Sequence, residues 1–354
     1  MTSRRHTLIT GGAGFVGTNL ADRIVSDGGR VLVFDNLARA GVEENLAWLT
    51  ERHADAVDVE IADVRDATAV NRAMAHADRA FHLAAQVAVT TSLDEPVLDA
   101  DVNLQGTINL LEAARARSRP PAVLFTSTNK VYGNLDDVDL RQRTTRYEPI
   151  DGALLDHGIG ERRPLQFCTP YGCSKGAADQ YVLDYAHSYG VPTVVFRMSC
   201  IYGPHQFGNE DQGWVAHFLI RALQETPITI FGDGKQVRDV LYVQDLVDAF
   251  LCAHADVERL AGRAFNIGGG VENCLSLVEL LDLIAEQNGR RPAVKHGPWR
   301  RGDQRYYVSD TSAFTKATGW APRTGPQEGV ARLMEWLREQ APGDRAAAAA
   351  AAVA

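Results

Sequence analysis

The stretch Thr10-Gly11-Gly12-Ala13-Gly14-Phe15-Val16-Gly17 decides the fold of this chain. It follows a short β-rich run over residues 6–10 and leads into a helical pattern over residues 18–26. Glycines in a strand–turn–helix unit let the backbone turn tightly and approach a pyrophosphate, whose charge the amides at the helix start stabilise. The stretch therefore predicts a dinucleotide-binding α/β fold.

Working outward from this unit, the chain up to Arg197 alternates β-rich apolar runs with longer helical stretches. Such alternation predicts right-handed crossovers and a parallel sheet covered by helices on both faces. The expected strands are residues 6–10, 30–35, 57–62, 79–83, 122–127 and 193–197. The expected helices begin near Gly14, Val42, Ala67, Pro96 and Pro170. The expected fold class is α/β: a doubly wound parallel sheet (Rossmann fold) with a smaller, discontinuous α/β substrate lobe.

After Arg197 the pattern changes, because Gly and Pro become frequent and helices shorten, although residues 264–267 look like one more strand of the main sheet. We expect the Rossmann domain over residues 1–199 and 240–268, and the substrate lobe over residues 200–239 and 269–341. The polar segment 133–168 is either an irregular loop or a small excursion over the site. Residues 342–354, rich in alanine with no face to bury, are expected to form a disordered tail.

Composition narrows the function classes. A 45% hydrophobic content suits a globular protein, and no apolar run approaches the roughly 18 residues of a membrane helix. The first ten residues lack the apolar stretch of a signal peptide, so we expect a cytoplasmic protein. A formal net charge of -9 gives no support for nucleic-acid binding. The five cysteines show neither a disulfide framework nor a zinc-ligand spacing, so reduced thiols and no metal are expected.

The cofactor site extends beyond the glycine turn. Asp35 ends the second expected strand, where its carboxylate can bind an adenosine ribose and would repel a 2′-phosphate, which favours NAD over NADP. Asp63 ends the third strand and either accepts a hydrogen bond from the adenine amino group or caps the next helix. The stretch His82-Leu83-Ala84-Ala85 either lets the cofactor lie against the backbone or packs around a core His82. The expected cofactor-binding residues are Gly11, Gly14, Phe15, Val16, Gly17, Asp35, Asn36, Asp63, Val64, Leu83, Ala84, Ala85, Asn103, Thr126, Tyr171 and Lys175.

The candidate catalytic residues are Thr128, Tyr171 and Lys175. Tyr171 and Lys175 are four positions apart, so both side chains lie on one face of a helix. A phenol keeps its proton to about pH 10, but a neighbouring ammonium and an oxidised nicotinamide both favour phenolate. Thr128 ends the fifth strand, at the sheet edge where ligands bind, and its hydroxyl can orient a substrate alcohol. By itself the Tyr–Lys spacing is equally compatible with surface packing.

With all these parts in order, the sequence resembles the extended short-chain dehydrogenase/reductase family over nearly its whole length. The resemblance implies that Thr128 is the catalytic hydroxyl and Tyr171 the acid/base. It also implies that Lys175 tunes Tyr171 and holds the nicotinamide ribose.

The pair after Thr128 separates branches of this family. Nucleotide-sugar 4,6-dehydratases carry Asp-Glu there and glucuronate decarboxylases a Glu, whereas this chain has Asn129-Lys130, which favours epimerisation over elimination. A narrower resemblance is to the CDP-paratose 2-epimerase (CDP-tyvelose 2-epimerase) branch, although Met198 stands where we expect His. This resemblance is carried by residues 127–133, 171–181, 211–214, 234–240 and 303–305, together with the long segment before Cys168.

The substrate implied by this resemblance is a nucleotide-linked sugar. Similar epimerases use an arginine at the position of Arg238 on the substrate diphosphate, and Arg305 is the expected second contact. Arg238 can instead pair with Asp239 or Asp245. The expected substrate-binding residues are Thr128, Asn129, Gln206, Gln212, Arg238 and Arg305, of which the two glutamines can equally be loop anchors.

Two other functions stay open on the sequence alone. One is a UDP-sugar 4-epimerase of the UDP-glucose or UDP-glucuronate type, and the other is a non-catalytic NAD-binding scaffold or sensor. The helix over residues 174–189 carries Tyr181, Leu183 and Tyr185 on more than one side. These side chains suit the interface of a homodimer or homotetramer, or burial inside one chain.

Overall fold

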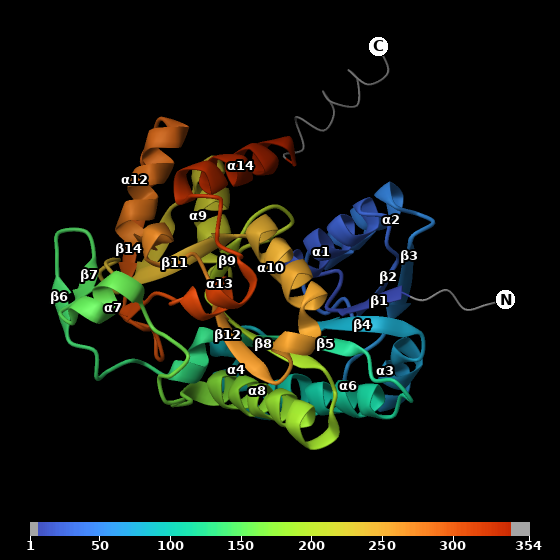
Figure 1. The fold of residues 1–354 in the computed structure, drawn as a ribbon. Coiled ribbons are helices and arrows are strands. Elements are labelled where there is room, and N and C mark those ends of the chain that lie inside the picture. The colour runs from blue at the N-terminus through green and yellow to red at the C-terminus, as the bar shows by residue number, and fades with distance from the viewer. Residues whose placement is uncertain (1–5, 341–354) are drawn as a thin grey trace, which may run out of the picture.

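The computed structural model describes residues 6–340, which fold around a seven-stranded parallel sheet (Figure 1). The strand order is β3-β2-β1-β4-β5-β8-β12. The strands are β1 (His6–Thr10), β2 (Val31–Asp35), β3 (Val57–Ile61), β4 (Ala77–His82), β5 (Ala122–Thr128), β8 (Thr193–Met198) and β12 (Arg263–Ile267). The sequence prediction of these strands and of the Rossmann fold class is confirmed. The order reverses between β1 and β4, which makes their carboxyl ends the topological switch point of the sheet.

Helices cover both faces of this sheet because neighbouring residues of each strand point to opposite sides. Ile9 of β1 packs in one core cluster and Leu8 in the other. The first cluster lies under α1 (Phe15–Ser26), α2 (Val42–Arg52) and α10 (Val243–Ala255). The second lies under α3 (Ala67–Met74), α6 (Gly106–Arg115) and α8 (Thr169–Tyr189), along the lower side of Figure 1. Burial on both faces explains why β1, β2, β5 and β8 read as nearly continuous apolar runs, whereas the edge strand β3 is partly exposed.

The helix expected from Pro96 is not a single α-helix. It consists of α5 (Pro96–Ala100), the π-turn η1 (Asp101–Gln105) and α6, and it follows the short helix α4 (Val89–Asp94). A π-turn changes the direction of the side chains it carries relative to a regular helix, and such turns often occur at functional sites.

A second substructure lies above the sheet in Figure 1. Some of its elements precede α10 in the chain and the others follow β12, so it is discontinuous in sequence. Its strands are β9 (Cys200–Tyr202), β10 (Ile228–Phe231), β11 (Val237–Tyr242), β13 (Cys274–Ser276), β14 (Val294–Gly297) and β15 (Tyr306–Tyr307). The helices α9 (Trp214–Leu223), α12 (Leu277–Asn288) and α14 (Pro326–Glu339) supply much of its own core cluster. The expected boundary after residue 239 falls inside β11, and the domain limits stay a prediction.

Three short helical elements complete the chain after α10. They are α11 (Val257–Leu260), η3 (Val271–Asn273) and α13 (Ser312–Thr318). Phe314 of α13 packs against Phe196 and Phe265 of the main sheet, with ring centroids 5.1 and 5.2 Å away. The late segment carrying α13 therefore returns to cover the Rossmann core.

The segment 133–168 is an ordered excursion. It contains the hairpin of β6 (Leu140–Gln142) and β7 (Tyr147–Pro149), followed by α7 (Gly152–His157), at the left of Figure 1. Asp151 caps α7 by accepting hydrogen bonds from the backbone amides of Ala153 and Leu154. Its apolar residues pack around the buried Tyr132 and Tyr307. None of its residues lines the cavity described below.

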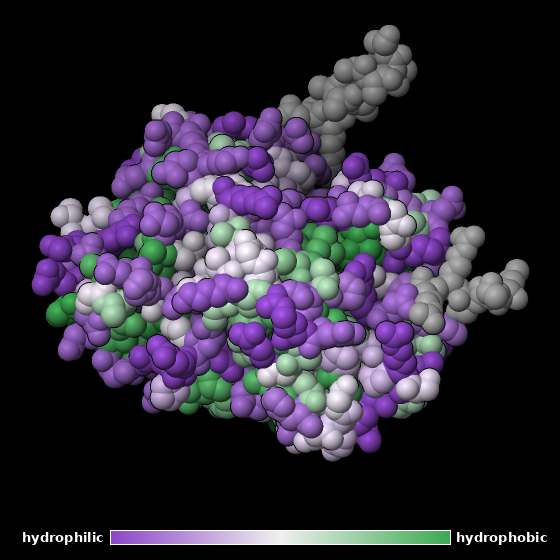
Figure 2. Space-filling view, in the orientation of Figure 1, coloured by the Kyte–Doolittle hydropathy of each residue, from purple (hydrophilic) through white to green (hydrophobic). Residues whose placement is uncertain are grey.

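The face of the molecule shown in Figure 2 is dominated by hydrophilic side chains, with apolar ones scattered among them. Within residues 6–340, no helix has the length and apolar character needed to cross a membrane. The tail expected at residues 342–354 lies outside the described residues.

Candidate active site

A cavity of about 1020 Å³ opens at the carboxyl edge of the main sheet. One wall is built from the ends of β1, β2, β4, β5 and β8, and the other from α9, β10, β11 and residues 300–303. The cavity therefore lies at the switch point between β1 and β4, where doubly wound sheets bind their ligands.

The glycine turn forms a cradle that side chains would fill. A Cβ atom on Gly11, whose φ is +70°, would lie 2.7 Å from the backbone nitrogen of Ala84. A Cβ on Gly17 would overlap the carbonyl oxygen of Gly11. Gly14 precedes α1 without any side-chain cap, which leaves the first amides of the helix available to an anion. The turn fits the pyrophosphate of a dinucleotide.

The Asp35 carboxylate is held in place at the end of β2. It accepts hydrogen bonds from the backbone amides of Ala13, at 3.1 Å, and Leu37, at 2.9 Å. Burial raises the pKa of Asp35, and these amides partly offset that effect. Because the carboxylate lines the cavity beside the glycine turn, it supplies a fixed acceptor for ribose hydroxyls.

Asp63 does not cap a helix. The cap of α3 is Asp66, whose side chain accepts from the amides of Thr68 and Ala69, so the capping alternative for Asp63 is wrong. Asp63 lines the cavity and binds the guanidinium of Arg65, which lowers the pKa of Asp63 to about 2. It also accepts a hydrogen bond of 2.9 Å from Asn36. An ionised acceptor therefore stands next to the expected adenine position.

Residues 82–85 divide into one core residue and three residues that line the cavity. His82 is a buried core residue whose ring nitrogens contact the hydroxyls of Thr10, at 2.7 Å, and Thr107, at 3.0 Å. Burial lowers the pKa of His82 to about 3, so the ring is neutral at pH 7. Leu83, Ala84 and Ala85 follow it and line the cavity.

Thr128, Tyr171 and Lys175 meet on the wall of the cavity. Burial raises the pKa of Tyr171 to about 12, an effect that a hydrogen bond from the Thr128 side chain reduces. Lys175, on the next turn of α8, is buried, and this lowers its pKa to about 7. Its ammonium lies 4.2 Å from the ring centroid of Phe125, which stabilises the charged form. The structure thus brings together the three residues expected to be catalytic.

A buried polar network supports this wall from behind. Asp99 accepts hydrogen bonds from Ser174, Gln86 and Asn103, and burial raises the pKa of Asp99. Asn103 lies on the π-turn, where it also binds the backbone of Gln86. Only 1% of Asn103 is exposed and it does not line the cavity; it holds Gln86, which does line the cavity, and its own contact with the cofactor stays a prediction.

The substrate half of the cavity is lined by Asn129, Gln206, Gln212 and Arg238. Arg238 donates to Asp303 at 2.7 Å and to the carbonyl of Gln304 at 2.5 Å, and no ion pair joins it to either expected partner, Asp239 or Asp245.

Arg305 does not reach the cavity, and its expected role on the diphosphate is corrected. Its side chain is exposed, and its guanidinium lies over the rings of Tyr147, at 5.6 Å, and Trp299, at 5.4 Å. Arg300 does line the cavity, with its guanidinium 3.8 Å from the ring centroid of Phe231. The sequence prediction named Arg305 of this segment and did not name Arg300. Arg300 and Arg301 stand directly before Gly302 and the motif Asp303-Gln304-Arg305.

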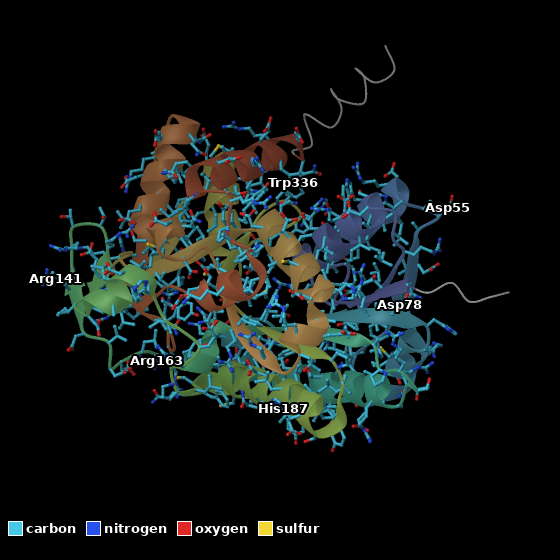
Figure 3. The ribbon with its side chains drawn as sticks, viewed as in Figure 1. Asp55, Asp78, Arg141, Arg163, His187 and Trp336 are labelled. Atoms are coloured by element: carbon cyan, nitrogen blue, oxygen red, sulfur yellow. The ribbon has the colours of Figure 1, made fainter. Side chains whose placement is uncertain are left out.

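Gln206 belongs to a loop that joins the two halves. The next residue back, His205, lies between the rings of Trp48, at 4.2 Å, and Trp336 of α14, at 5.2 Å; Figure 3 labels Trp336. The backbone carbonyl of His205 accepts from Asn45 at 3.1 Å. The buried Oε1 atom of Gln206 has no hydrogen-bond partner among the described residues, so it can accept from a ligand in the cavity.

Residues 7–268 match the NAD dependent epimerase/dehydratase family. The chain belongs to this family. It is 43% identical to CDP-paratose 2-epimerase of Salmonella typhi over 336 residues, which cover 93% of this chain and 98% of that protein. It is 34% identical to UDP-glucose 4-epimerase of Mycolicibacterium smegmatis, covering 94% of this chain and 99% of that protein. The solved UDP-glucose 4-epimerase of Thermus thermophilus in complex with NAD is 33% identical, with a TM-score of 0.81, and the match covers 95% of this chain and 100% of that one.

The family and the site agree on the chemistry. The chain is an NAD-dependent enzyme of the epimerase type, and the glycine cradle with Asp35 fits NAD.

The nucleotide released on denaturation is predicted to be NAD rather than NADP, because the fixed Asp35 carboxylate repels a 2′-phosphate. Asp35→Asn keeps an oxygen for the amide of Ala13 but removes the charge, and should raise the affinity for NADP relative to NAD by about tenfold or more. Chromatography of the released nucleotide and titration with both cofactors measure this. Asp58→Asn, on the exposed edge strand, is the matched control. Predominant NADP in the wild type would refute the assignment.

Proposed function

We propose that the protein is a CDP-paratose 2-epimerase, which inverts C2 of a CDP-linked 3,6-dideoxy sugar to give CDP-tyvelose. The observation that carries the proposal is the pair Asn129-Lys130, which lines the cavity directly beside Thr128. Neither side chain is a carboxylate that could act as general base for the loss of water. The 43% identity to CDP-paratose 2-epimerase over 93% of the chain supports the same branch.

The residues of this chain act on the carbinol hydroxyl. Thr128 and Tyr171 bind it, and Tyr171 takes its proton. The chemistry that bound NAD supplies is reversible hydride transfer at the carbinol carbon. Burial holds Tyr171 protonated, with a pKa of about 12, so its activation needs nearby positive charge. Lys175, one helical turn away, provides that charge and binds the nicotinamide ribose.

Oxidation is the favoured route because of the sugar itself. In a 3,6-dideoxy sugar, C2 has no neighbouring ketone to acidify its hydrogen, so direct deprotonation faces a prohibitive barrier. Oxidation of the C2 hydroxyl to a 2-keto sugar avoids this barrier, and return of the hydride to the other face of C2 inverts the carbon.

Inversion requires the sugar to present its other face while the nucleotide stays bound. We assign the grip on the diphosphate to Arg238, whose charged side chain lines the cavity. The cavity of about 1020 Å³ runs from the glycine turn to Arg238, so the same space is available to the cofactor and to the nucleotide sugar.

A UDP-sugar 4-epimerase is the second candidate, supported by the 34% identity to the Mycolicibacterium smegmatis enzyme. Met198 stands where the CDP-paratose 2-epimerase resemblance predicts His, so it is relevant to which sugar the site accepts. It pairs in register with Thr128 across β8 and β5 and lines the cavity, so the replacement of the expected His alters the surroundings of the sugar. A non-catalytic scaffold would not need Thr128, Tyr171 and Lys175 to converge as they do.

We also propose a cytoplasmic homodimer or homotetramer. The five cysteines are all free thiols, as in reducing compartments. On α8, Tyr181 is 46% and Tyr189 51% exposed, and α5, which packs against α8, exposes 72% of Val97. Tyr185 is instead buried within the chain. These exposed side chains suit a helix-to-helix interface.

Light scattering is predicted to give a multiple of the 38.6 kDa chain mass. Tyr181→Glu should shift the protein toward the monomer, because a charge would be buried in the apolar contact. A wild-type monomer at micromolar concentration would contradict this proposal without touching the catalytic one.

Tyr171→Phe is predicted to lower kcat by about 100- to 10,000-fold, because only the proton-transferring hydroxyl is lost. NAD content and the unfolding temperature should stay close to wild type. A variant with nearly wild-type turnover would refute the mechanism.

Substrate carrying deuterium at C2 is predicted to give product that keeps the label in ordinary water, with no added NADH. Mass spectrometry and NMR of the product measure retention. Washout of the label into solvent would show an enolising route instead.

A further inference from the structure

Lys130 lines the cavity one residue beyond Asn129, in the 3-10 turn η2 (Asn129–Tyr132) that continues β5. Its ammonium donates to the backbone carbonyl of Gly302 at 3.0 Å and lies 3.5 Å from Oε1 of Gln304. Both partners are neutral. Within residues 6–340, Lys130 therefore has no carboxylate of its own.

The segment that Lys130 holds, residues 300–304, closes one wall of the cavity. Gln304 donates from Nε2 to the carbonyl of Gly133 at 2.5 Å, which ties the segment to the end of η2. A Cβ on Gly302, whose φ is +77°, would lie 3.0 Å from Cγ2 of Thr169, the first residue of α8. The segment thus packs against the two elements that carry Thr128 and Tyr171.

The charged groups around the Lys130 ammonium do not neutralise one another. Lys130 and Arg238 both line the cavity, and the carboxylate between them is Asp303, which pairs with Arg238 at 2.7 Å. Cys168 and Cys200 also face Lys130, and burial raises the pKa of Cys200, so that thiol is neutral at pH 7. Among the groups that act on the Lys130 ammonium, two cations and one carboxylate therefore leave one positive charge, while Arg300, on the same segment, has carboxylate partners of its own in Glu210 and Asp211. A partly buried excess charge is costly unless an anion neutralises it.

We propose that Lys130 is a positioning residue for the nucleotide sugar: it holds residues 300–304 against the catalytic turn, and its charge attracts the substrate diphosphate together with Arg238. The inference rests on the proposed function in requiring a substrate that carries a nucleoside diphosphate. It adds Lys130 to Arg238 as a second cation that binds the diphosphate, and it makes the affinity for the substrate depend on the protonation of Lys130.

Burial and the nearby Arg238 lower the pKa of Lys130 to about 8. The charged form binds the diphosphate, so affinity should fall as the pH rises through that value. A guanidinium stays charged over this range. Lys130→Arg should therefore bind with little dependence on pH. Other groups in the cavity that titrate, such as Lys175, are common to both proteins, so the difference between their pH curves isolates Lys130.

The test is calorimetric titration of the NAD-loaded enzyme with CDP, UDP and dTDP. Lys130→Met removes the charge and should weaken the best-bound nucleotide by about tenfold or more. Lys130→Arg should bind within a few-fold of wild type at about pH 7, and more tightly than wild type at about pH 9. In turnover assays the loss in Lys130→Met should fall on KM more than on kcat. Lys235→Met is the matched control, since Lys235 also donates to a backbone carbonyl, that of Arg143, but lies outside the cavity.

Unchanged affinity in Lys130→Met, or identical pH curves for wild type and Lys130→Arg, would overturn the inference while leaving the epimerase proposal intact. If Lys130→Met fails to fold, the pH curves of Lys130→Arg and wild type still decide. If the wild type binds none of the three nucleotides, this inference and the proposed function fall together.

Discussion

The close approach of the glycine turn to the end of β4 is the contact on which the site depends. Because Gly11 lies against the backbone of Ala84, and Gly17 against the carbonyl of Gly11, no side chain can enter this part of the switch point. The space is left to a ligand, and the uncapped start of α1 selects an anionic one. The same packing brings Asp35 to the turn, since the carboxylate accepts the amide of Ala13. The packing of the glycine turn therefore determines both the local fold and the preference for NAD over NADP.

Without ligands, burial disfavours charge on the catalytic residues Tyr171 and Lys175. Burial raises the pKa of Tyr171 to about 12 and lowers that of Lys175 to about 7, so it favours the neutral form of both. In the proposed mechanism, the charged form of Lys175 and the oxidised nicotinamide together supply the positive charge that favours the phenolate of Tyr171. Next to this wall, the positive charge of Lys130 beside Thr128 and of Arg238 on β11 remains until an anionic substrate arrives. NAD thus supplies positive charge to the catalytic residues, and the anionic substrate neutralises the positive charge of Lys130 and Arg238.

The sequence predicted whatever depends on local pattern. The strands of the main sheet, the glycine turn and the cavity positions of Thr128, Tyr171 and Lys175 follow from apolar runs, turn residues and helical spacing. What it missed depends on tertiary geometry. Asn103 lies on a π-turn that directs it toward Gln86 and Ser174, and Arg305 is drawn to the rings of Tyr147 and Trp299. The contact of Lys130 with Gly302 joins residues 172 positions apart, and Arg300 reaches Glu210 over 90 positions; no local spacing reveals either contact.

The most direct test of the central claim is the product of the reaction. Pure enzyme would be incubated with CDP-, UDP-, dTDP- and GDP-linked sugars, with no added NAD or NADH, and followed by NMR. We expect CDP-paratose and CDP-tyvelose to interconvert, with inversion at C2 alone. Inversion at C4 of a UDP-sugar with no change in the CDP-sugars, or loss of water to a 4-keto-6-deoxy product, would contradict it.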